Sequence, residues 1–158
     1  TPIMSASSHA LSDPGTTAAV QRCTCFNLRK AARAVTQLYD DVLRPSGLRA
    51  TQFSLLMLIR AAGKVPMTEL AEAAVMDRTT LKRNLVLLER EGLVRIEPGD
   101  DARVREVILT KAAEKRLAAA LPYWRRAQAQ VTGKLGPGRA DRLLGDLAAA
   151  IASAGQGS

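Results

Sequence analysis

Apolar residues recur at spacings of three and four along most of this chain, which is the pattern of amphipathic α-helices. The first stripe predicts a helix over residues 23–43, and the Pro-Ser-Gly sequence at 45–47 ends it because proline cannot continue the helical hydrogen bonds. A second predicted helix covers residues 51–62 and stops at Gly63. The apolar face of the first helix comprises Leu28, Ala31, Ala32, Val35, Leu38, Tyr39 and Val42.

Two shorter helices follow, joined by a tight turn. Thr68 is the expected N-cap of the first, TELAEAA, and Asp77 is that of the second, DRTTLKRNLVLLEREG, because short polar side chains accept hydrogen bonds from first-turn amides. Gly92 is placed to end the second helix. Leucines at 81, 85 and 88 lie on one side of this helix, so we expect that side to be buried.

A hairpin and two further helices complete the pattern. LVRIE and REVILT alternate like paired strands, and PGDDA between them has turn chemistry. Thr110 is expected to cap a long helix to about residue 134, with a kink or break at Pro122, and LGPGRADRLLGDLAAAIASAG supplies the last helix. Its inward residues are expected to be Leu143, Leu144, Leu147 and Ile151. The predicted fold is mostly α with a small β-hairpin wing, a winged helix-turn-helix with flanking helices.

Composition narrows the class of partner. Lys and Arg outnumber Asp and Glu by 23 to 15, and this excess suits a polyanion such as nucleic acid. No apolar run approaches the roughly 18 residues that cross a bilayer, and the first twenty residues lack a signal-peptide pattern. We therefore expect a cytoplasmic protein with no membrane partner. Residues 1–19 are rich in Ser, Thr, Ala, Pro and Gly, and predict a disordered tail.

Catalytic chemistry is not apparent in the sequence. The single histidine, His9, falls in the predicted tail, and the chain has no glycine-rich phosphate loop, metal-ligand cluster or nucleophile with an evident base. The cysteines Cys23 and Cys25 are too few for a disulfide framework, which fits a reducing compartment. Two residues apart on a regular helix, they also point too far apart to share a metal ion or a bond. No enzyme activity, cofactor or metal is expected.

The candidate DNA-contacting residues lie opposite the leucine face of the second short helix. Arg78 and Thr79, near its amino end, are expected to meet base edges, because recognition helices present their first turns to the major groove. Lys82 and Arg83 are placed for bases or phosphates. Thr68 and Thr80 offer hydroxyls and cap amides to phosphate oxygens. A merely solvated helix face is the alternative, and the short helix before it and the hairpin after it argue against that alternative.

The hairpin tip adds a second candidate contact. Arg103 is expected to enter the minor groove, where negative potential is concentrated, with Arg105 nearby and Asp101 orienting the guanidinium. The alternative is an exposed ion pair worth at most about 1 kcal/mol. Residues 77–106 contain seven basic and seven acidic side chains, so the acids must point away from DNA or pair locally. The argument for DNA therefore rests on geometry.

The segment MTELAEAAVMDRTTLKRNLVLLEREGLVRIEPGDDARVREVILT resembles the MarR family, the multiple antibiotic resistance regulators, and the resemblance runs from about residue 23 to 151. It implies a homodimeric transcriptional regulator, with residues 20–48 and 111–155 as dimerisation helices and 49–110 as the DNA-binding domain. It also implies that Arg103 and Asp101 are the minor-groove arginine and its acidic partner. The chain departs from a common pattern at Val75, where many relatives have Gly, and at Ala113.

Dimerisation also follows from physics, because two recognition helices roughly 34 Å apart read successive major grooves of a pseudo-palindromic double-stranded operator. The family commonly releases DNA on binding a small aromatic or anionic effector, such as an aromatic acid or its coenzyme A ester, and a repressor is expected. Apolar walls with a few arginines suit such a ligand. The candidate effector residues are Phe26, Arg29, Arg33, Phe53, Met57 and Trp124.

Redox sensing is the alternative mode of control. The segment CFNLRKAARAVTQLYD resembles the cysteine-bearing first helix of the organic hydroperoxide resistance regulators, in which the thiol of the residue corresponding to Cys25 senses oxidants. Here Arg29 stands where those sensors tend to have Tyr. Operator sequence, target genes and effector identity are not encoded in any pattern of the chain.

Overall fold

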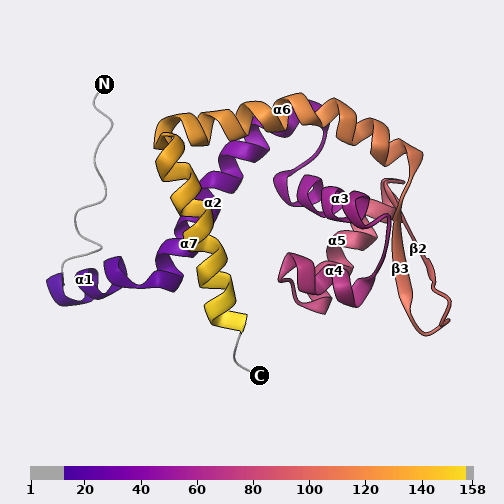
Figure 1. Cartoon of the computed structure of the whole chain (residues 1–158), viewed down its shortest axis with the longest axis horizontal. Helices are drawn as coiled ribbons and strands as arrows, with labels where there is room; N and C mark the ends of the chain where they lie inside the picture. Colours follow the sequence, from indigo (N-terminus) through magenta and orange to yellow (C-terminus); the bar gives the residue numbers. More distant parts are fainter. Residues whose placement is uncertain (1–12, 156–158) are drawn as a thin grey trace. The chain divides into compact units, whose positions relative to one another are not determined.

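The computed structural model describes residues 13–155, which divide into two compact units, residues 13–37 and 38–155, each described by itself. The fold is mostly helical, with one small sheet (Figure 1). In chain order the elements are α1 (Pro14–Arg22), α2 (Thr24–Leu43), the 3-10 turn η1 (Arg44–Ser46), α3 (Ala50–Ala62), β1 (Lys64–Pro66), α4 (Met67–Ala74), α5 (Arg78–Arg90), β2 (Val94–Pro98), β3 (Arg105–Leu109), α6 (Lys111–Leu135) and α7 (Pro137–Gly155).

The first unit contains a helix where a disordered tail was expected. Helix α1 begins at Pro14, and Asp13 caps it by accepting a hydrogen bond from the Thr16 amide at 3.1 Å. The prediction of disorder is therefore wrong for residues 14–19, while residues 1–12 lie outside the described part of the chain. Proline at the first helical position and an aspartate before it are favourable start signals, and they outweigh the weak apolar pattern of this segment.

The core of the second unit lies between α3, α4 and α5. The predicted leucine face of α5 is confirmed, since Leu81, Leu85 and Leu88 are at most 1% exposed. Leu56 and Ile59 of α3 are fully buried in the same cluster. Burying a leucine side chain contributes roughly 1.5–3 kcal/mol, so this packing fixes the orientation of α5 and thereby of its polar face.

Both ends of α5 follow the predicted signals, but the start of α4 does not. Asp77 caps α5, and Gly92 follows the last residues of the helix with φ 71°. Thr68 is not an N-cap: α4 begins one residue earlier, at Met67, after Pro66 in extended geometry, and no side chain caps it. Strand β1 runs directly into α4, so the backbone leaves the sheet and enters the helix without a polar capping residue.

The sheet has three strands where a two-stranded hairpin was expected. Its order is β1-β3-β2, and both neighbouring pairs are antiparallel. Val107 pairs with Val65 on one side and Ile96 on the other. On the solvent side, Lys64 Nζ of β1 lies 2.8 Å from Glu106 Oε2 and 3.8 Å from Glu97 Oε1, and its contact with Glu106 raises the pKa of Lys64. These ion pairs link all three strands.

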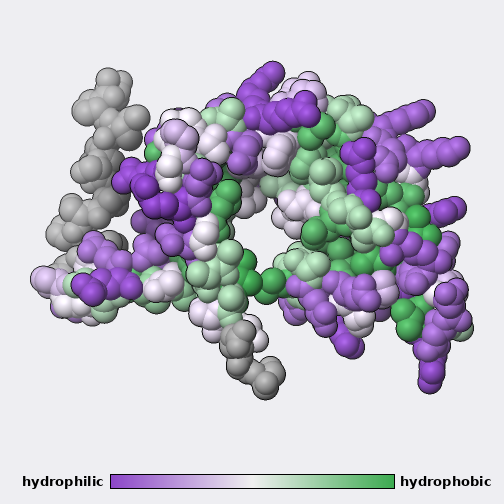
Figure 2. All heavy atoms as spheres, viewed as in Figure 1, coloured by the Kyte–Doolittle hydropathy of each residue, from purple (hydrophilic) through white to green (hydrophobic). Residues whose placement is uncertain are grey.

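Helix α6 passes through Pro122 as one continuous helix of 25 residues, so the predicted break does not occur. Thr110 caps it, as expected, by accepting a hydrogen bond from the Ala113 amide at 3.2 Å. Helix α7 turns back after Gly136. Three of its four residues expected to face inward are instead exposed within the single chain: Leu143 41%, Leu144 60% and Ile151 56%. Figure 2 shows hydrophobic residues on the visible face of α7.

Candidate nucleic-acid interface

Helix α5 presents its polar face to solvent because its leucine face is anchored in the core. Arg78, Thr79, Lys82 and Arg83 are all exposed, as the helical spacing predicts. Within residues 13–155, no ion pair involves Arg78 or Lys82. Their charges are thus available to an anionic partner.

The amino end of α5 is held by two hydrogen bonds that Thr80 donates to the Asp77 carboxylate. The Thr80 amide donates to Asp77 Oδ1 at 2.9 Å, and its hydroxyl donates to Oδ2 at 2.6 Å. These hydrogen bonds lower the pKa of Asp77. Thr80 is therefore committed to the cap, and its expected donation to a phosphate would require that the cap open.

At the tip of the wing, the Asp101 carboxylate accepts three hydrogen bonds from Arg103. The Arg103 side chain donates from Nε to Asp101 Oδ1 at 3.2 Å and from Nη2 to Oδ2 at 3.1 Å, while its backbone amide donates to Oδ1 at 3.0 Å. The predicted orienting contact is therefore present, and its hydrogen bonds from Arg103 lower the pKa of Asp101. The Arg103 side chain is nevertheless 90% exposed. A bidentate pair of this kind restricts the direction of the guanidinium while leaving its outer edge open.

In the wing turn, the backbone of Gly99 lies close to the Glu106 side chain. A Cβ atom on Gly99 would lie 2.8 Å from Glu106 Cδ, closer than side chains allow. The Gly99 amide donates to the Val104 carbonyl at 2.8 Å and closes the loop that carries Arg103. Only glycine fits at this point without shifting Glu106, which is itself held by Lys64.

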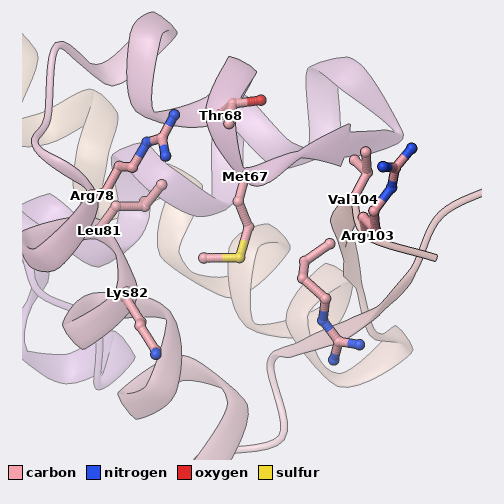
Figure 3. A pocket seen from close by; sticks show the side chains of 8 residues that line it. Met67, Thr68, Arg78, Leu81, Lys82, Arg103 and Val104 are labelled. Carbon is pink, nitrogen blue, oxygen red and sulfur yellow. The ribbon is translucent and has the colours of Figure 1, made fainter. Parts of the chain in front are cut away.

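A cleft of about 340 Å³ separates α5 from the wing (Figure 3). It brings together five of the predicted DNA-contacting residues, from α4, α5 and the wing. These are Thr68, Arg78, Lys82, Arg103 and Arg105. The remaining residues of the lining, Met67, Leu81 and Val104, were not predicted. Their positions depend on the packing of α4 and on the path of the wing, which hydrophobic periodicity does not report.

Four cationic residues line this cleft, and its described lining contains no acidic residue. Several acids of the neutral 77–106 segment make local contacts, and only the contact of Asp101 involves a cation of the cleft, Arg103. Glu97 and Glu106 lie near Lys64, Asp101 holds Arg103, and Asp77 caps α5. Local pairing of the acids thus leaves a positive cleft in a segment with no net charge.

The predicted effector residues divide between the two units. Phe53, Met57 and Trp124 line one apolar cleft of about 390 Å³, together with Ser54, Leu58 and Leu121. The Phe53 and Trp124 rings stack, with centroids 5.9 Å apart. The other three candidates belong to the first unit, where each is exposed on α2: Phe26, Arg29 and Arg33.

Both cysteines are exposed, but they do not share one regular helix. Cys23 adopts extended geometry, with φ −70° and ψ 114°, between α1 and α2, whereas Cys25 lies in the first turn of α2. The Asn27 side chain donates to the backbone carbonyls of Gln21 and Cys23 at 2.8 and 2.9 Å and fixes this junction. The helical argument against a bond between the two thiols is therefore wrong in its premise.

Residues 13–155 contain no cluster of three or more His, Cys, Asp or Glu side chains suited to a metal ion. None of their helices combines the length and apolar character that a membrane crossing needs.

The recognition helix, the preceding helix and the antiparallel wing define a winged helix-turn-helix protein. Comparison with known proteins agrees with this class. A model described as the MarR family matches residues 46–103. The M. tuberculosis transcriptional regulator MosR, solved in complex with DNA, is 42% identical, covers 85% of this chain and 99% of its own, and gives a TM-score of 0.75.

Two other relatives extend the likeness. The uncharacterized HTH-type transcriptional regulator YwoH of Bacillus subtilis is 31% identical over 97 residues, which are 61% of this chain and 71% of YwoH. The transcriptional repressor CouR, solved bound to a 23-mer DNA duplex, is 27% identical, with 84% and 94% of the two chains covered and a TM-score of 0.75. The chain belongs to the MarR family of DNA-binding transcriptional regulators, which are not enzymes. The predicted family and fold class are confirmed.

Proposed function

We propose that this protein is a homodimeric transcriptional repressor that binds a pseudo-palindromic operator and releases it when a small aromatic or anionic ligand binds. The observation that carries the proposal is the cationic cleft between α5 and the wing, with Arg103 held at its edge by Asp101. A recognition helix in a major groove and a wing arginine in the adjacent minor groove require such an arrangement. The DNA complexes of MosR and CouR, and the name of CouR as a repressor, support it.

The roles of the DNA-contacting residues follow from their positions. Arg78 and Thr79, in the first turn of α5, read base edges, and Lys82 and Arg83 contact bases or phosphates. Thr68 and Arg105 contact the backbone from the two sides of the cleft. Thr80 and Asp101 act indirectly, by holding the α5 amino end and Arg103.

Dimerisation is supported by apolar faces that one chain leaves uncovered. In α7, Leu144 and Ile151 are more than half exposed, and in α2 Phe26 and Val35 are each 40% exposed. Burying such side chains against a second chain is favourable by roughly 25 cal/mol per Å². The segments 20–48 and 111–155 therefore form the proposed dimer body, and 49–110 the DNA-binding domain.

The apolar cleft at Phe53, Met57 and Trp124 is the proposed effector site. Its volume of about 390 Å³ and its stacked aromatic wall suit one aromatic ring system. No basic residue is among the described residues of this lining, so it favours the aromatic part of a ligand. Arg29 and Arg33, exposed on α2 in the first unit, stay sequence-based candidates for an acid group or a coenzyme A ester.

Selection of bound duplexes from a random DNA pool tests the main proposal. Two inverted half-sites with centres roughly 34 Å apart are expected, because a two-fold dimer presents its recognition helices with that spacing. A strictly monomeric protein that prefers no duplex over scrambled competitor would overturn the proposal. Competition of the selected duplex with aromatic acids and their coenzyme A esters then tests the effector.

Oxidation of Cys25 is the second candidate signal. The exposure of both thiols and the junction at Cys23 between α1 and α2 favour it, because reactive cysteines need access to solvent. Affinity for the selected duplex is measured before and after peroxide treatment, for the wild type and for Cys25→Ser. A peroxide-dependent loss that Cys25→Ser abolishes is expected for a sensor, and unchanged wild-type affinity would eliminate this alternative.

A further inference from the structure

The cleft between α5 and the wing has an apolar floor beneath its cationic rim. Leu81 forms the base and is 1% exposed, Met67 directs its thioether into the space, and Val104 lies on the wing side (Figure 3). Arg78 and Lys82 belong to α5, Arg105 is the first residue of β3, and Arg103 lies in the wing loop before it. Such a cleft suits a ligand in which anionic groups are joined by apolar carbon atoms. The anionic groups would meet the cations at the rim, and the carbon atoms would meet the floor.

The proposed mode of DNA binding supplies such a ligand. When α5 enters a major groove and the wing enters the adjacent minor groove, one sugar-phosphate strand separates the two grooves. That strand has to cross between α5 and the wing, where the cleft lies. Its phosphates carry the negative charges and its deoxyriboses provide the apolar carbon.

We infer that this cleft seats the sugar-phosphate strand between the two grooves, and that Met67 and Val104 select 2′-deoxyribose there. The inference rests on the proposed DNA-binding function and adds a specificity for the sugar. Rim cations meet the phosphates, and the uncapped first-turn amides of α4 lie at the same edge, beside Thr68. The floor meets the C2′ methylene group of the sugar.

A ribose at this point would bury its 2′-hydroxyl against carbon and sulfur. A hydroxyl buried without a good partner costs free energy, and a thioether sulfur is only a weak acceptor. The Thr68 hydroxyl offers no evident compensation, because it points away from Met67 (Figure 3). Met67 and Val104 thus favour deoxyribose over ribose, whereas the cations that bind phosphate do not distinguish the two sugars.

A ribose scan of the selected duplex tests this inference. Each nucleotide of one half-site is replaced in turn by its ribonucleotide, and binding is measured with the full-length protein. For the wild type, one or two adjacent positions on one strand should lose roughly tenfold in affinity, the cost of an unpaired buried hydroxyl. Other positions should change by less than about twofold, apart from any sensitivity to sugar pucker.

Two variants separate contact with the hydroxyl from a change of sugar pucker. Met67→Gln places an amide of similar length on the floor, and Val104→Thr adds a hydroxyl with little change of shape; each provides the 2′-hydroxyl with a partner. Either variant should reduce the tenfold penalty to about twofold at the same position, whereas Met67→Leu should keep it. Because Met67 also packs on the core, thermal unfolding establishes that its variants fold.

The failures of the two proposals are distinguishable. Wild-type protein that binds no all-deoxy duplex would overturn the DNA-binding function, and the sugar specificity with it. Tight binding of the all-deoxy duplex with a flat ribose scan would overturn the sugar specificity alone. The same result follows if the penalty is equal in the wild type, Met67→Gln and Val104→Thr, because pucker would then account for it.

Discussion

Helices α5 and α7 carry leucines at similar helical spacings, but they use them differently. In α5, Leu85 and Leu88 are fully buried by the rest of the chain. In α7, Leu144 and Ile151 are 60% and 56% exposed. Large apolar side chains grouped in this way on one helix are typical of a surface that another protein covers. An apolar stripe on a helix therefore predicts burial, but it does not say whether the same chain or another chain buries it.

The difference also separates two kinds of stability. The core around α5 is buried by other segments of the same chain, so it is formed without a second copy. In the proposed homodimer a second chain covers the α7 face, so changes there should act first on assembly and only then on DNA binding. Substitutions at equivalent apolar positions should therefore have different consequences in the two helices.

Leu144→Glu in α7 should have the largest effect. A carboxylate in the proposed dimer face should give monomers in analytical ultracentrifugation, because burying an unpaired charge is strongly unfavourable. Affinity for the selected duplex should fall on the order of 100-fold or more, since each chain then binds one half-site alone. Leu87→Glu is the matched control for assembly, because it adds the same charge at an exposed leucine outside α7 and should leave the protein dimeric. A dimeric Leu144→Glu protein would contradict the proposed interface.

Leu85→Ala in α5 should act on the fold instead. Removing a fully buried leucine side chain costs about 2–5 kcal/mol of unfolding free energy, measured by chemical denaturation. Leu87→Ala on the same helix should change it by less than about 0.5 kcal/mol, because Leu87 is 48% exposed. Equal effects of the two substitutions would mean that α5 is not anchored by its leucine face.

The elements predicted well from sequence are those whose signals are local. Asp77 and Gly92 frame α5 because a cap and a left-handed glycine each act on the adjacent backbone. Asp101 and Arg103 are two residues apart, so their pairing needed no knowledge of the tertiary fold. Both predictions agree with the structure because no distant segment competes with these contacts.

The features that were missed depend on distant segments or on short patterns. Strand β1 has three residues, too few to show alternation, and it is a strand because Val65 pairs with Val107 from far along the chain. The place of Met67 in the cleft was missed for a related reason, because α4 begins at Met67, directly after the last residue of β1. At Pro122 the expected break is absent, and α6 continues through it as one helix of 25 residues.

Arg103→Ala should weaken DNA binding by roughly 10- to 100-fold, the effect of losing a specific groove contact worth about 1–3 kcal/mol. The matched control is Arg44→Ala, which removes another exposed arginine paired with an aspartate, Asp41, at the end of α2. That change should leave affinity within about twofold, because a solvated ion pair contributes little. Titration of the selected duplex by fluorescence anisotropy measures both. Equal affinities of the two variants would mean that the Asp101–Arg103 pair is only a surface ion pair.

Val75→Gly should have the smallest effect, and it should be stabilising. Val75 joins α4 to α5 with φ 49° and ψ 50°, a left-handed conformation that costs a side chain with a branched Cβ about 1–2 kcal/mol. The residue is 73% exposed, so glycine loses little packing. After the greater chain entropy of glycine is subtracted, a net gain of about 1 kcal/mol is expected, which raises Tm by roughly 2–4 °C. Ala74→Gly, in regular helix, should instead lower Tm; a fall in both variants would show that the turn at Val75 holds no strain.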